Sequence, residues 1–487
     1  MILEIGFNIY LAILMVIFLL YCIKDCKRPK NFPTGPRFLP FIGTSWIIPA
    51  KGMEYLIPKW KNKYGNFIGH KFYHKKLVVF CGSQEIIEGL KHPNFQGRYV
   101  SEFLKQRTHN KALGFFFADD ETWCEVRRFA LRYFGTVFTK ELENILHDEL
   151  LEEFGTIRSG DIHQIDRNFM KSALNAILKI MVGVHRKDFQ SEIDEMIEKT
   201  GKAFAAGRPT GIESVYPFFS GFFQNHLFVD AAHSLQKFLK ARLEERKKSF
   251  DSLDIKDYTD AFINESLKEL QLHGKVENFT DEEFLSCGTD LVQAGNEAVV
   301  NTVQFILLYV AMNQRIQLKL HEEIDRVIGS NRYPSLNDKT NMAYLEATIH
   351  EGMRINPIAP IGAMHRVTKD TQFREYFFEK DTLITFALKY AMHDPEYWQN
   401  PDKFLPERFI GNESLKKKII TFGLGKRSCI GEVFSRNFVF LYLAYFFQRF
   451  SIKLPQNDLP STDPILGFTN GPKPFKLIIT KRERMDE

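Results

Sequence analysis

The sequence predicts a mainly α-helical protein with a minor β subdomain and one N-terminal helix that spans a membrane. Three observations lead to this fold class. Residues 5–23 form a continuous apolar run, residues 50–90 hold short apolar stretches separated by turns, and residues 120–450 show helical periodicity along most of their length. The 487 residues are 44% hydrophobic and 26% charged, which is typical of a globular chain and excludes a largely disordered or repetitive one.

Charge and cysteine usage exclude two further classes of protein. The net charge of +5 is mild for this length and does not indicate a nucleic-acid binder. The six cysteines include no Cys-x-x-Cys pair, so we expect no zinc ribbon and no dithiol redox site, and their scatter is typical of a reducing compartment. The 46 phenylalanines fit either core packing or a large apolar ligand cavity.

Residues 1–23 are predicted to be a membrane anchor. At about 1.5 Å of rise per residue, the apolar run is roughly 28 Å long, close to the hydrocarbon thickness of a bilayer. Lys24 and Lys27 follow it at once, and basic residues beside a span mark its cytoplasmic side. A cleaved signal peptide is the alternative, but it would need a basic stretch before the run, where only Glu4 is charged, and a small-residue cleavage site after it.

Residues 24–45 follow as a basic and proline-rich linker. Pro33 and Pro36 lie within it, and proline restricts both its own backbone and that of the residue before it. We therefore expect a stiff elbow between the anchor and the rest of the chain. Residues 46–487 contain no internal repeat and no long linker, and the length of the chain by itself suggests about three domains.

The longest predicted helix begins near Thr280 and ends near Met312. Thr280 with Glu283 three residues later is a capping-box pattern, in which each side chain bonds the backbone N–H of the other residue. The segment contains no proline, and at about 1.5 Å per residue it spans roughly 48 Å. Because it is apolar along much of its length, we expect it to be largely buried, with a helical domain built around it.

Cys429 is the cysteine most suited to chemistry. It lies within residues 422–431, FGLGKRSCIG, after a glycine-rich turn and before an apolar helical run. A helix N-terminus and the nearby Lys426 and Arg427 favour a thiolate, and the glycines let a flat or bulky group approach the backbone. A lone thiolate beside open backbone suits the axial ligand of a haem iron. An inert buried cysteine and a nucleophilic cysteine remain alternatives.

The segment around Cys429 resembles the haem-binding signature of cytochrome P-450, Phe-x-x-Gly-x-Arg-x-Cys-x-Gly. Other family motifs are matched along the chain, and the resemblance extends from the anchor to the C-terminal strands. The similarity is to the animal microsomal branch of drug- and steroid-hydroxylating enzymes, and most of all to an insect member of it. The matched residues are Phe422, Gly425, Arg427, Cys429 and Gly431 in the signature, Glu351 with Arg354, Arg408 within Pro406 to Phe409, and Trp123 with Arg127.

The resemblance implies a fold, a cofactor and a set of site residues. Residues 46–487 would be a haem-thiolate catalytic domain with the cytochrome P-450 fold, and Cys429 would bind the iron of haem b. Glu351, Arg354 and Arg408 would form a buried charge triad. The other cofactor-binding residues would be Arg98, Trp123, Arg127, His365, Phe422, Gly425 and Arg427, of which the basic and indole side chains suit the haem propionates.

The chain departs from the family pattern in one residue of the long helix. The family usually carries Ala-Gly-x-Asp/Glu-Thr above the iron, whereas this chain has Ala294, Gly295, Glu297 and Ala298. In members with the threonine, its hydroxyl orders water and helps to deliver protons to dioxygen, which alanine cannot do. Glu297 can still relay protons through water. Thr302 lies one turn further along a similar face.

The resemblance and this departure together leave three functions open. The first is a monooxygenase that inserts one oxygen atom from dioxygen into a lipophilic small molecule. The second is a haem-thiolate isomerase or dehydratase that acts on a hydroperoxide without dioxygen, and the third is a non-catalytic haem- or lipid-binding protein. For the monooxygenase, the resemblance implies electrons from NADPH through NADPH-cytochrome reductase, with cytochrome b5 as a further candidate partner. It also implies a place on the cytosolic face of the endoplasmic reticulum membrane.

The resemblance also implies where the partner and the substrate bind. Segments expected to line the substrate pocket are residues 99–117, the region near 200–230, Ile358 to Gly362 and the turn near Thr469, and they do not identify the substrate. A basic surface for an acidic flavoprotein is expected near the cysteine loop, with a solubilising charge run as the alternative. Its residues would be Arg128, Arg132, Lys416, Lys417, Lys418 and Lys426.

Overall fold

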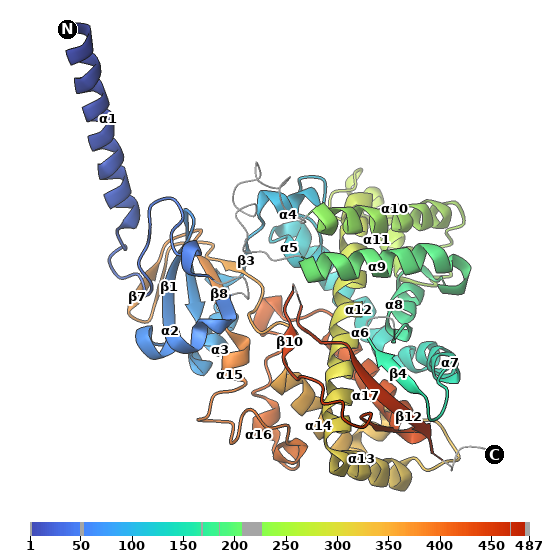
Figure 1. Ribbon diagram of the computed structural model, residues 1–487. Helices are drawn as coiled ribbons and strands as arrows, with labels where there is room; N and C mark the ends of the chain where they lie inside the picture. The colour runs from blue at the N-terminus through green and yellow to red at the C-terminus, as the bar shows by residue number, and fades with distance from the viewer. Residues whose placement is uncertain are drawn as a thin grey trace. The chain divides into compact units, whose positions relative to one another are not determined.

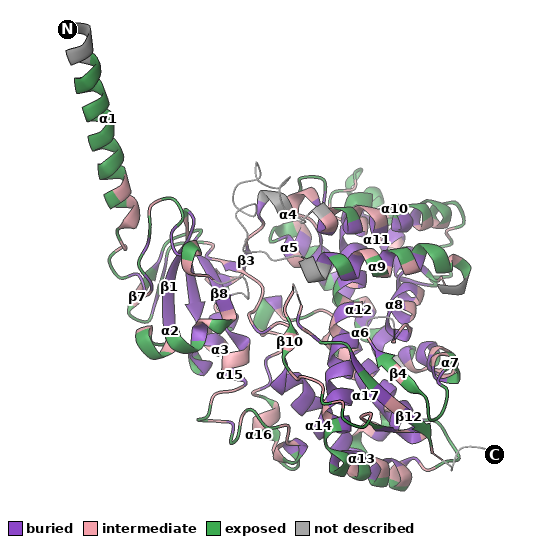
Figure 2. Ribbon diagram, viewed as in Figure 1, coloured by how far each residue is buried: buried purple, intermediate pink, exposed green. Residues whose placement is uncertain are grey.

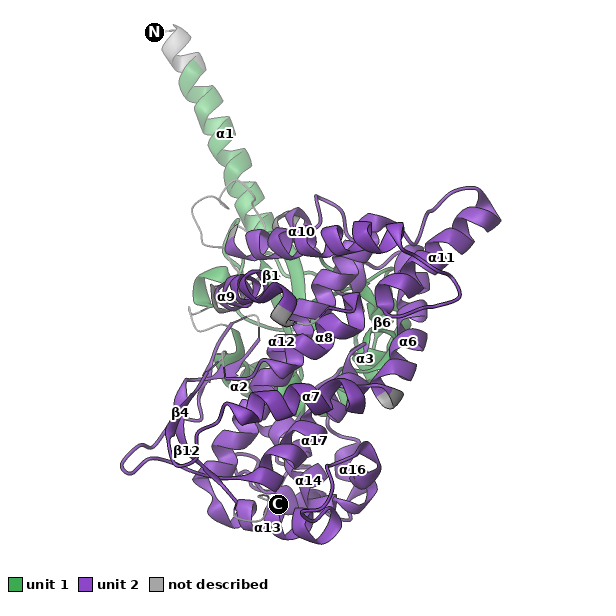
Figure 3. Cartoon of the chain, turned by 90° about the vertical axis from the view of Figure 1, so that its right-hand side faces the viewer, with its two compact units in different colours: residues 1–99, 360–391, 423–427 green, residues 100–359, 392–422, 428–487 purple. Residues whose placement is uncertain are grey.

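The computed structural model divides the chain into two compact units (Figure 3). It describes residues 2–48, 53–166, 169–184, 186–206, 226–467 and 469–482. Residues 207–225, within the region near 200–230 expected to line the substrate pocket, lie outside the described part of the chain. Unit 1 contains residues 1–99, 360–391 and 423–427, and unit 2 contains residues 100–359, 392–422 and 428–487.

Unit 1 begins with the apolar helix α1, Ile2–Cys26 (Figure 1). Its stretch Phe7–Cys26 has a mean hydropathy of 2.2 and none of it is buried; it is the one helix among the described residues that is long and apolar enough to cross a membrane. The end of α1 is held against the body of unit 1 because Lys71 forms an ion pair with Asp25. Lys71 Nζ also donates to the backbone oxygen of Asp25 at 2.9 Å.

The remainder of unit 1 is a five-stranded sheet with short helices. The predicted small sheet within residues 50–90 is confirmed as its first two strands, and the other three come from later or intervening segments, in the order β1-β2-β8-β5-β3. The two longest strands bury Phe67 and Phe80, whose rings lie edge to face 4.9 Å apart. The elements are β1 Phe67–Phe72, β2 Lys75–Phe80, β3 Gly97–Arg98, β5 His365–Arg366, β8 Leu383–Phe386, the hairpin β6 Thr371–Phe373 and β7 Tyr376–Phe378, and helices α2 Ile57–Tyr64, α3 Ser83–Lys91 and α15 Leu388–Ala391.

Unit 2 is mainly helical and carries two small sheets. One sheet has the strand order β4-β12-β9 and the other is the pair β10-β11. Its helices are α4 Glu102–Gln106, α5 Gly114–Phe117, α6 Glu121–Lys140, α7 Leu142–Gly155, α8 Ser172–Val182, α9 Gln190–Ala206, α10 His226–Lys248, α11 Tyr258–His273, α12 Asp281–Met312, α13 Gln314–Val327, α14 Ala343–Ile355, α16 Glu413–Lys416 and α17 Glu432–Arg449. Its strands are β4 Ile162–Ile165, β9 Phe450–Lys453, β10 Pro464–Ile465, β11 Gly471–Pro472 and β12 Phe475–Lys481.

The long helix α12 confirms the predicted helix over its full 32 residues, and Figure 2 shows most of it buried. Thr280 is its N-cap, and its hydroxyl accepts the N–H of Glu283 at 3.2 Å. The second half of the predicted capping box is wrong, because the Glu283 carboxylate accepts the N–H of Gly114 at 3.1 Å instead. The N-terminal end of α12 therefore holds the start of α5.

The charge triad implied by the motifs is formed inside unit 2. Arg354 donates through Nε and Nη2 to the two oxygens of Glu351 at 2.7 and 2.9 Å, and both side chains are fully buried. Arg408 adds a third bond, with Nε 3.2 Å from Glu351 Oε1. Arg354 also donates to the backbone oxygens of Met392 and Pro401, so the triad ties α14 to the loop before α16.

Candidate active site

Cys429 lies two residues before the N-cap of α17, where its backbone is held and its thiol is open to solvent. Its N–H donates to the backbone oxygen of Phe422 at 2.7 Å, which closes the loop between them. The side chain of Cys429 is exposed, while α17 behind it is buried along most of its length. The Phe422 ring faces the Arg436 guanidinium at 4.9 Å, which holds the start of the loop against α17. The loop thus presents one accessible sulfur on a packed helix.

The environment of the Cys429 thiol differs in one respect from the prediction. Burial among protein atoms raises its pKa, although the Gly431 amide bonds the sulfur and Arg127 lies close enough to oppose this shift. Desolvation thus acts against the thiolate, whereas the Gly431 amide and Arg127 act in its favour. A bound metal cation would supply the missing positive charge, since coordination deprotonates a thiol outright.

Trp123 and Arg127 come from α6, one turn apart. The guanidinium of Arg127 lies 5.5 Å from the Trp123 ring, and its Nη2 donates to the backbone oxygen of Ser428, beside Cys429. Arg127 is buried, and desolvation lowers its pKa. The Trp123 indole N–H donates to the backbone oxygen of Phe115 at 3.0 Å. A bond from the indole to a haem propionate would therefore have to replace this one, whereas Arg127 already lies at the cysteine.

Unit 1 gathers the other three basic side chains of the predicted set. Arg98 and His365 are paired across β3 and β5, and Arg427 Nε donates to the backbone oxygen of Gln96 at 2.9 Å. All three are buried. Burial, together with the charges of Arg98 and Arg427, holds the pKa of His365 well below its usual value, while its Nδ1 donates to Phe95 O at 2.6 Å. Such a cluster of buried positive charge is suited to an anionic group such as a carboxylate.

Gly425 lies in unit 1, where the backbone requires glycine. Its φ is +75°, and an added Cβ would lie 2.9 Å from the backbone oxygen of Leu90. A side chain is therefore excluded both by conformation and by contact. The glycine at this signature position keeps the turn close to α3.

The four residues predicted on α12 have different surroundings. Ala294 is exposed and Ala298 is half-buried, although the helix around them is mostly buried, so these two small side chains form an accessible stripe one turn apart. Glu297 is buried beside this stripe. Gly295 serves packing, because an added Cβ would lie 2.8 Å from Cδ1 of Ile177 on α8.

Thr302 does not replace the hydroxyl that Ala298 lacks. Its Oγ1 donates to the backbone oxygen of Ala298 at 2.7 Å, one turn back along the helix. Thr302 is also buried. In this local bond the hydroxyl proton of Thr302 points to the backbone oxygen of Ala298.

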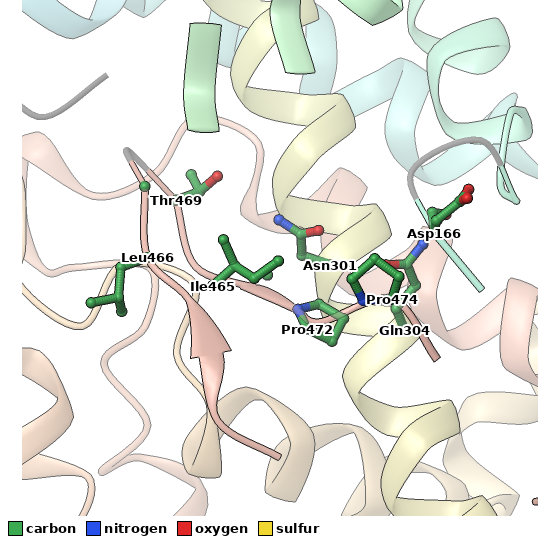
Figure 4. A pocket seen from close by; sticks show the side chains of 10 residues that line it. Asp166, Asn301, Gln304, Ile465, Leu466, Thr469, Pro472 and Pro474 are labelled. Carbon is green, nitrogen blue, oxygen red and sulfur yellow. Dashed lines mark hydrogen bonds between the residues drawn. The ribbon is translucent and has the colours of Figure 1, made fainter. Parts of the chain in front are cut away.

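A cavity of about 260 Å³ lies against the next part of α12, inside unit 2 (Figure 4). Asn301 and Gln304 line it from the helix, and Thr469 and Ile465 line it from the turn between β10 and β11 and the end of β10. The structure therefore places Thr469 beside α12, one turn beyond Ala298. The cavity is partly polar, which makes it a place where water can be held.

These observations test whether the residues fit a haem. Unit 2 offers an accessible thiol for the iron, the guanidinium of Arg127 near it, and a stripe of small side chains on α12 for a small ligand. Unit 1 by itself offers the glycine turn and a cluster of basic side chains suited to carboxylates. The donors suit iron and carboxylates, and no predicted site residue has a chemistry that opposes the cofactor.

Comparison with known proteins decides the family. The family model named cytochrome P450 matches residues 33–479. The chain belongs to the cytochrome P450 family. It is 31% identical to a farnesoate epoxidase of Bombyx mori, over 97% of this chain and 99% of that protein. It is also 31% identical to cytochromes P450 2J3 and 2B2 of Rattus norvegicus, over 97% of this chain in each case and 95% and 99% of those proteins.

Family membership establishes the class of chemistry. This cytochrome P450 is an oxidoreductase, and its cofactor is haem whose iron is bound by a cysteine. The non-catalytic alternative is therefore not supported. The fold prediction, mainly helical with small sheets and one N-terminal apolar helix, is confirmed.

Sequence reasoning missed two polar residues of this cytochrome P450 that lie on α12. Asp290 forms a buried ion pair with Arg107 and accepts the N–H of Phe116 at 3.0 Å. Gln293 is buried one turn before Glu297. Their spacing from Glu297, seven and four residues, places all three on one face of the helix, and that signal is visible in the sequence. The contacts that each side chain makes are not visible in the sequence, because they come from distant segments.

Proposed function

We propose that this cytochrome P450 is a monooxygenase of lipophilic small molecules, with Cys429 as the axial ligand of its haem. The observation that carries the proposal is the accessible thiol of Cys429 in a complete signature loop, with its amide on Phe422 and Arg127 beside it. Electrons would come from NADPH through a flavoprotein reductase, with cytochrome b5 as a second candidate donor. Bound haem would supply the activation of dioxygen, one atom of which enters the substrate while the other leaves as water.

The chain's own residues would have separate tasks in this reaction. Cys429 would hold the cofactor, and Arg98, His365 and Arg427 in unit 1 would bind its carboxylates, as would Arg127 in unit 2. The stripe of Ala294 and Ala298 would leave room for dioxygen and substrate, and the buried Glu297 carboxylate would move protons there.

The substrate class is proposed as apolar with an oxidisable carbon or double bond. The Bombyx mori relative is named for acting on farnesoate, and the rat relatives are equally similar to this chain, so one compound class is not singled out. A screen of unsaturated terpenoids and fatty acids by the haem spectral shift on binding is the first measurement.

The test of the function uses the full chain with its haem, a reductase, NADPH and isotopically labelled dioxygen. We expect one labelled atom in the product, with no product when NADPH or the reductase is left out. Cys429→Ser should lose the thiolate-type spectrum of the reduced, carbon-monoxide-bound protein and lose turnover. Unlabelled product formed from a hydroperoxide without reductase would contradict the monooxygenase.

That contradicting result is what the second candidate function predicts. An isomerase or dehydratase of hydroperoxides needs no proton delivery to dioxygen, and the observation in its favour is the alanine at 298 together with the engaged hydroxyl of Thr302.

The membrane location is proposed as the cytosolic face of the endoplasmic reticulum. The exposed apolar stretch Phe7–Cys26 is followed by Lys27, Arg28 and Lys30, which favour a cytosolic position for the body of the chain. Protease added to sealed microsomes should digest the body and leave the anchor; full protection of the body would contradict this orientation.

A further inference from the structure

Gln293 is a buried amide whose Nε2 has no hydrogen-bond partner in the part of the chain that the structure describes, and it lies one helical turn before the catalytic carboxylate. Its side chain is only 3% exposed. Its Nε2 has no hydrogen-bond partner among the described residues. Buried polar groups in folded proteins are almost always bonded, either to protein or to ordered water. A site for a water molecule at this amide is therefore expected.

Asn296 supplies a complementary atom at the same place. It lies three residues after Gln293, so the two side chains are neighbours on α12. The Oδ1 of Asn296 is buried and likewise has no hydrogen-bond partner among the residues that the structure describes. The two side chains do not bond each other, although one is a donor and the other an acceptor. A water between them would satisfy both, accepting from Nε2 and donating to Oδ1.

Glu297 is placed to share that water. It follows Gln293 by four residues, and side chains on a helix lean toward its N-terminus, over the preceding turn. We therefore expect the Glu297 carboxylate to lie toward the amide of Gln293. Glu297 is 5% exposed, so it is as buried as the amide. A bridging water would have the partners that a buried water needs.

The absence of a hydroxyl at position 298 makes such a water useful. Ala298 cannot order water, and Thr302 is bonded to the backbone of Ala298. We propose that Gln293, with Asn296, is a positioning residue that holds the water through which Glu297 delivers protons in the monooxygenase reaction. Glu297 gives its proton to this water, the water passes one of its own to the reacting oxygen, and Glu297 regains a proton from solvent. The inference rests on the proposed monooxygenase function.

The test compares the haem-loaded full chain with Gln293→Leu, which keeps the volume and removes the amide. The matched control is Gln317→Leu, a buried glutamine on α13 whose amide donates to the backbone oxygen of Ile452 at 3.1 Å. Because general acid catalysis contributes roughly 10²- to 10⁴-fold, we expect loss of its water to lower product formed per NADPH by about tenfold in Gln293→Leu, with peroxide released instead. Gln317→Leu should form as much product per NADPH as the wild type.

Two further measurements separate positioning from structure. A crystal structure of the wild-type holoenzyme should show a water on Gln293 Nε2 that is absent from Gln293→Leu. Adding Ala298→Thr to Gln293→Leu should restore the product formed per NADPH, because the new hydroxyl can order water again. The proposal would be overturned if Gln293→Leu formed as much product per NADPH as the wild type, or if its structure kept the water. It would also be overturned if adding Ala298→Thr did not restore the product formed per NADPH. Absence of any oxygen incorporation by the wild type would instead refute the monooxygenase function itself.

Discussion

Glu283, at the start of α12, shows how one buried carboxyl joins distant segments. It accepts the N–H of Gly114 and contacts the thiol of Cys287 at 3.5 Å, and it is 2% exposed. Burial is the largest influence on it, and the nearby charges of Asp290 and Asp120 act in the same direction, so its pKa rises from 4.5 to about 7. The Glu283 carboxyl therefore keeps its proton at pH values at which an exposed glutamate is ionised.

This shift predicts a pH dependence of stability. Between about pH 4.5 and 7 the folded state keeps a proton that the unfolded state has released, so the free energy of unfolding falls as pH rises through this window. Glu283→Gln has no such titration and keeps an oxygen for Gly114. From pH 5 to pH 8, urea unfolding of the detergent-solubilised chain should show the wild type losing about 2–3 kcal/mol relative to the variant. Equal pH slopes for the two proteins would contradict the shift.

Cys429 is the residue for which local pattern and surroundings give opposite indications. Its place before a helix and beside basic residues predicts a thiolate, and the Gly431 amide and Arg127 do act in that direction, but desolvation by the surrounding protein raises the thiol pKa. Desolvation depends on every segment packed around the sulfur, so the sequence pattern could not reveal it.

At the scale of elements, the contact between α14 and α12 depends on a missing side chain. An added Cβ at Gly352 would lie 2.3 Å from Cγ1 of Ile306, so the two helices approach through this glycine. The same helix α14 carries Glu351 and Arg354, so its distance from α12 also places the charge triad.

Gly352→Ala should therefore destabilise the protein. Overpacking of a close helix contact costs about 1–3 kcal/mol, which a urea midpoint can measure. The matched control is Gly135→Ala in α6, where an added Cβ meets no other described atom within 4 Å. That change should be neutral or stabilising by roughly 0.5–1 kcal/mol, because alanine loses less backbone entropy than glycine. An equal change in the free energy of unfolding at the two sites would show that the close contact at Gly352 does not determine the stability.

At the scale of the whole molecule, the basic surface predicted for a redox partner is only partly available. Arg128 donates to Glu125, Lys416 pairs with Glu413, and Lys418 lies over the ring of Tyr397. Two other members of the set, Arg132 on α6 and Lys417 after α16, are exposed. Because both side chains are exposed, these two should contribute to steering an acidic partner.

The double variant Arg132→Glu and Lys417→Glu should be reduced by the reductase more slowly than the wild type. We expect a decrease of about tenfold at low salt that shrinks as salt is added, since steering charges act on the rate of encounter. Lys476→Glu on β12 is the control, and Figure 3 shows β12 on the other side of unit 2 from α6 and α16. Stopped-flow reduction under carbon monoxide measures the rate. An unchanged rate in the double variant, or an equal decrease in the control, would contradict a docking role.

The parts of this protein that the sequence predicted are those with a local or repeating signal. The helix from Asp281 to Met312, the first two strands and the exposed apolar helix all follow from periodicity and run length. The signature around Cys429 is contiguous, so five residues in register carried the family without any knowledge of the fold.

The sequence by itself determined the class of this protein: its family, its cofactor chemistry and its long central helix. Only the tertiary structure decided which polar groups are satisfied. In the folded protein the Trp123 indole and the Thr302 hydroxyl each donate to a backbone oxygen. Gln293 Nε2 is buried without a bond among the described residues. The physical reason is that a motif is a property of neighbours along the chain, whereas desolvation and hydrogen bonding depend on whatever distant segment packs against each side chain.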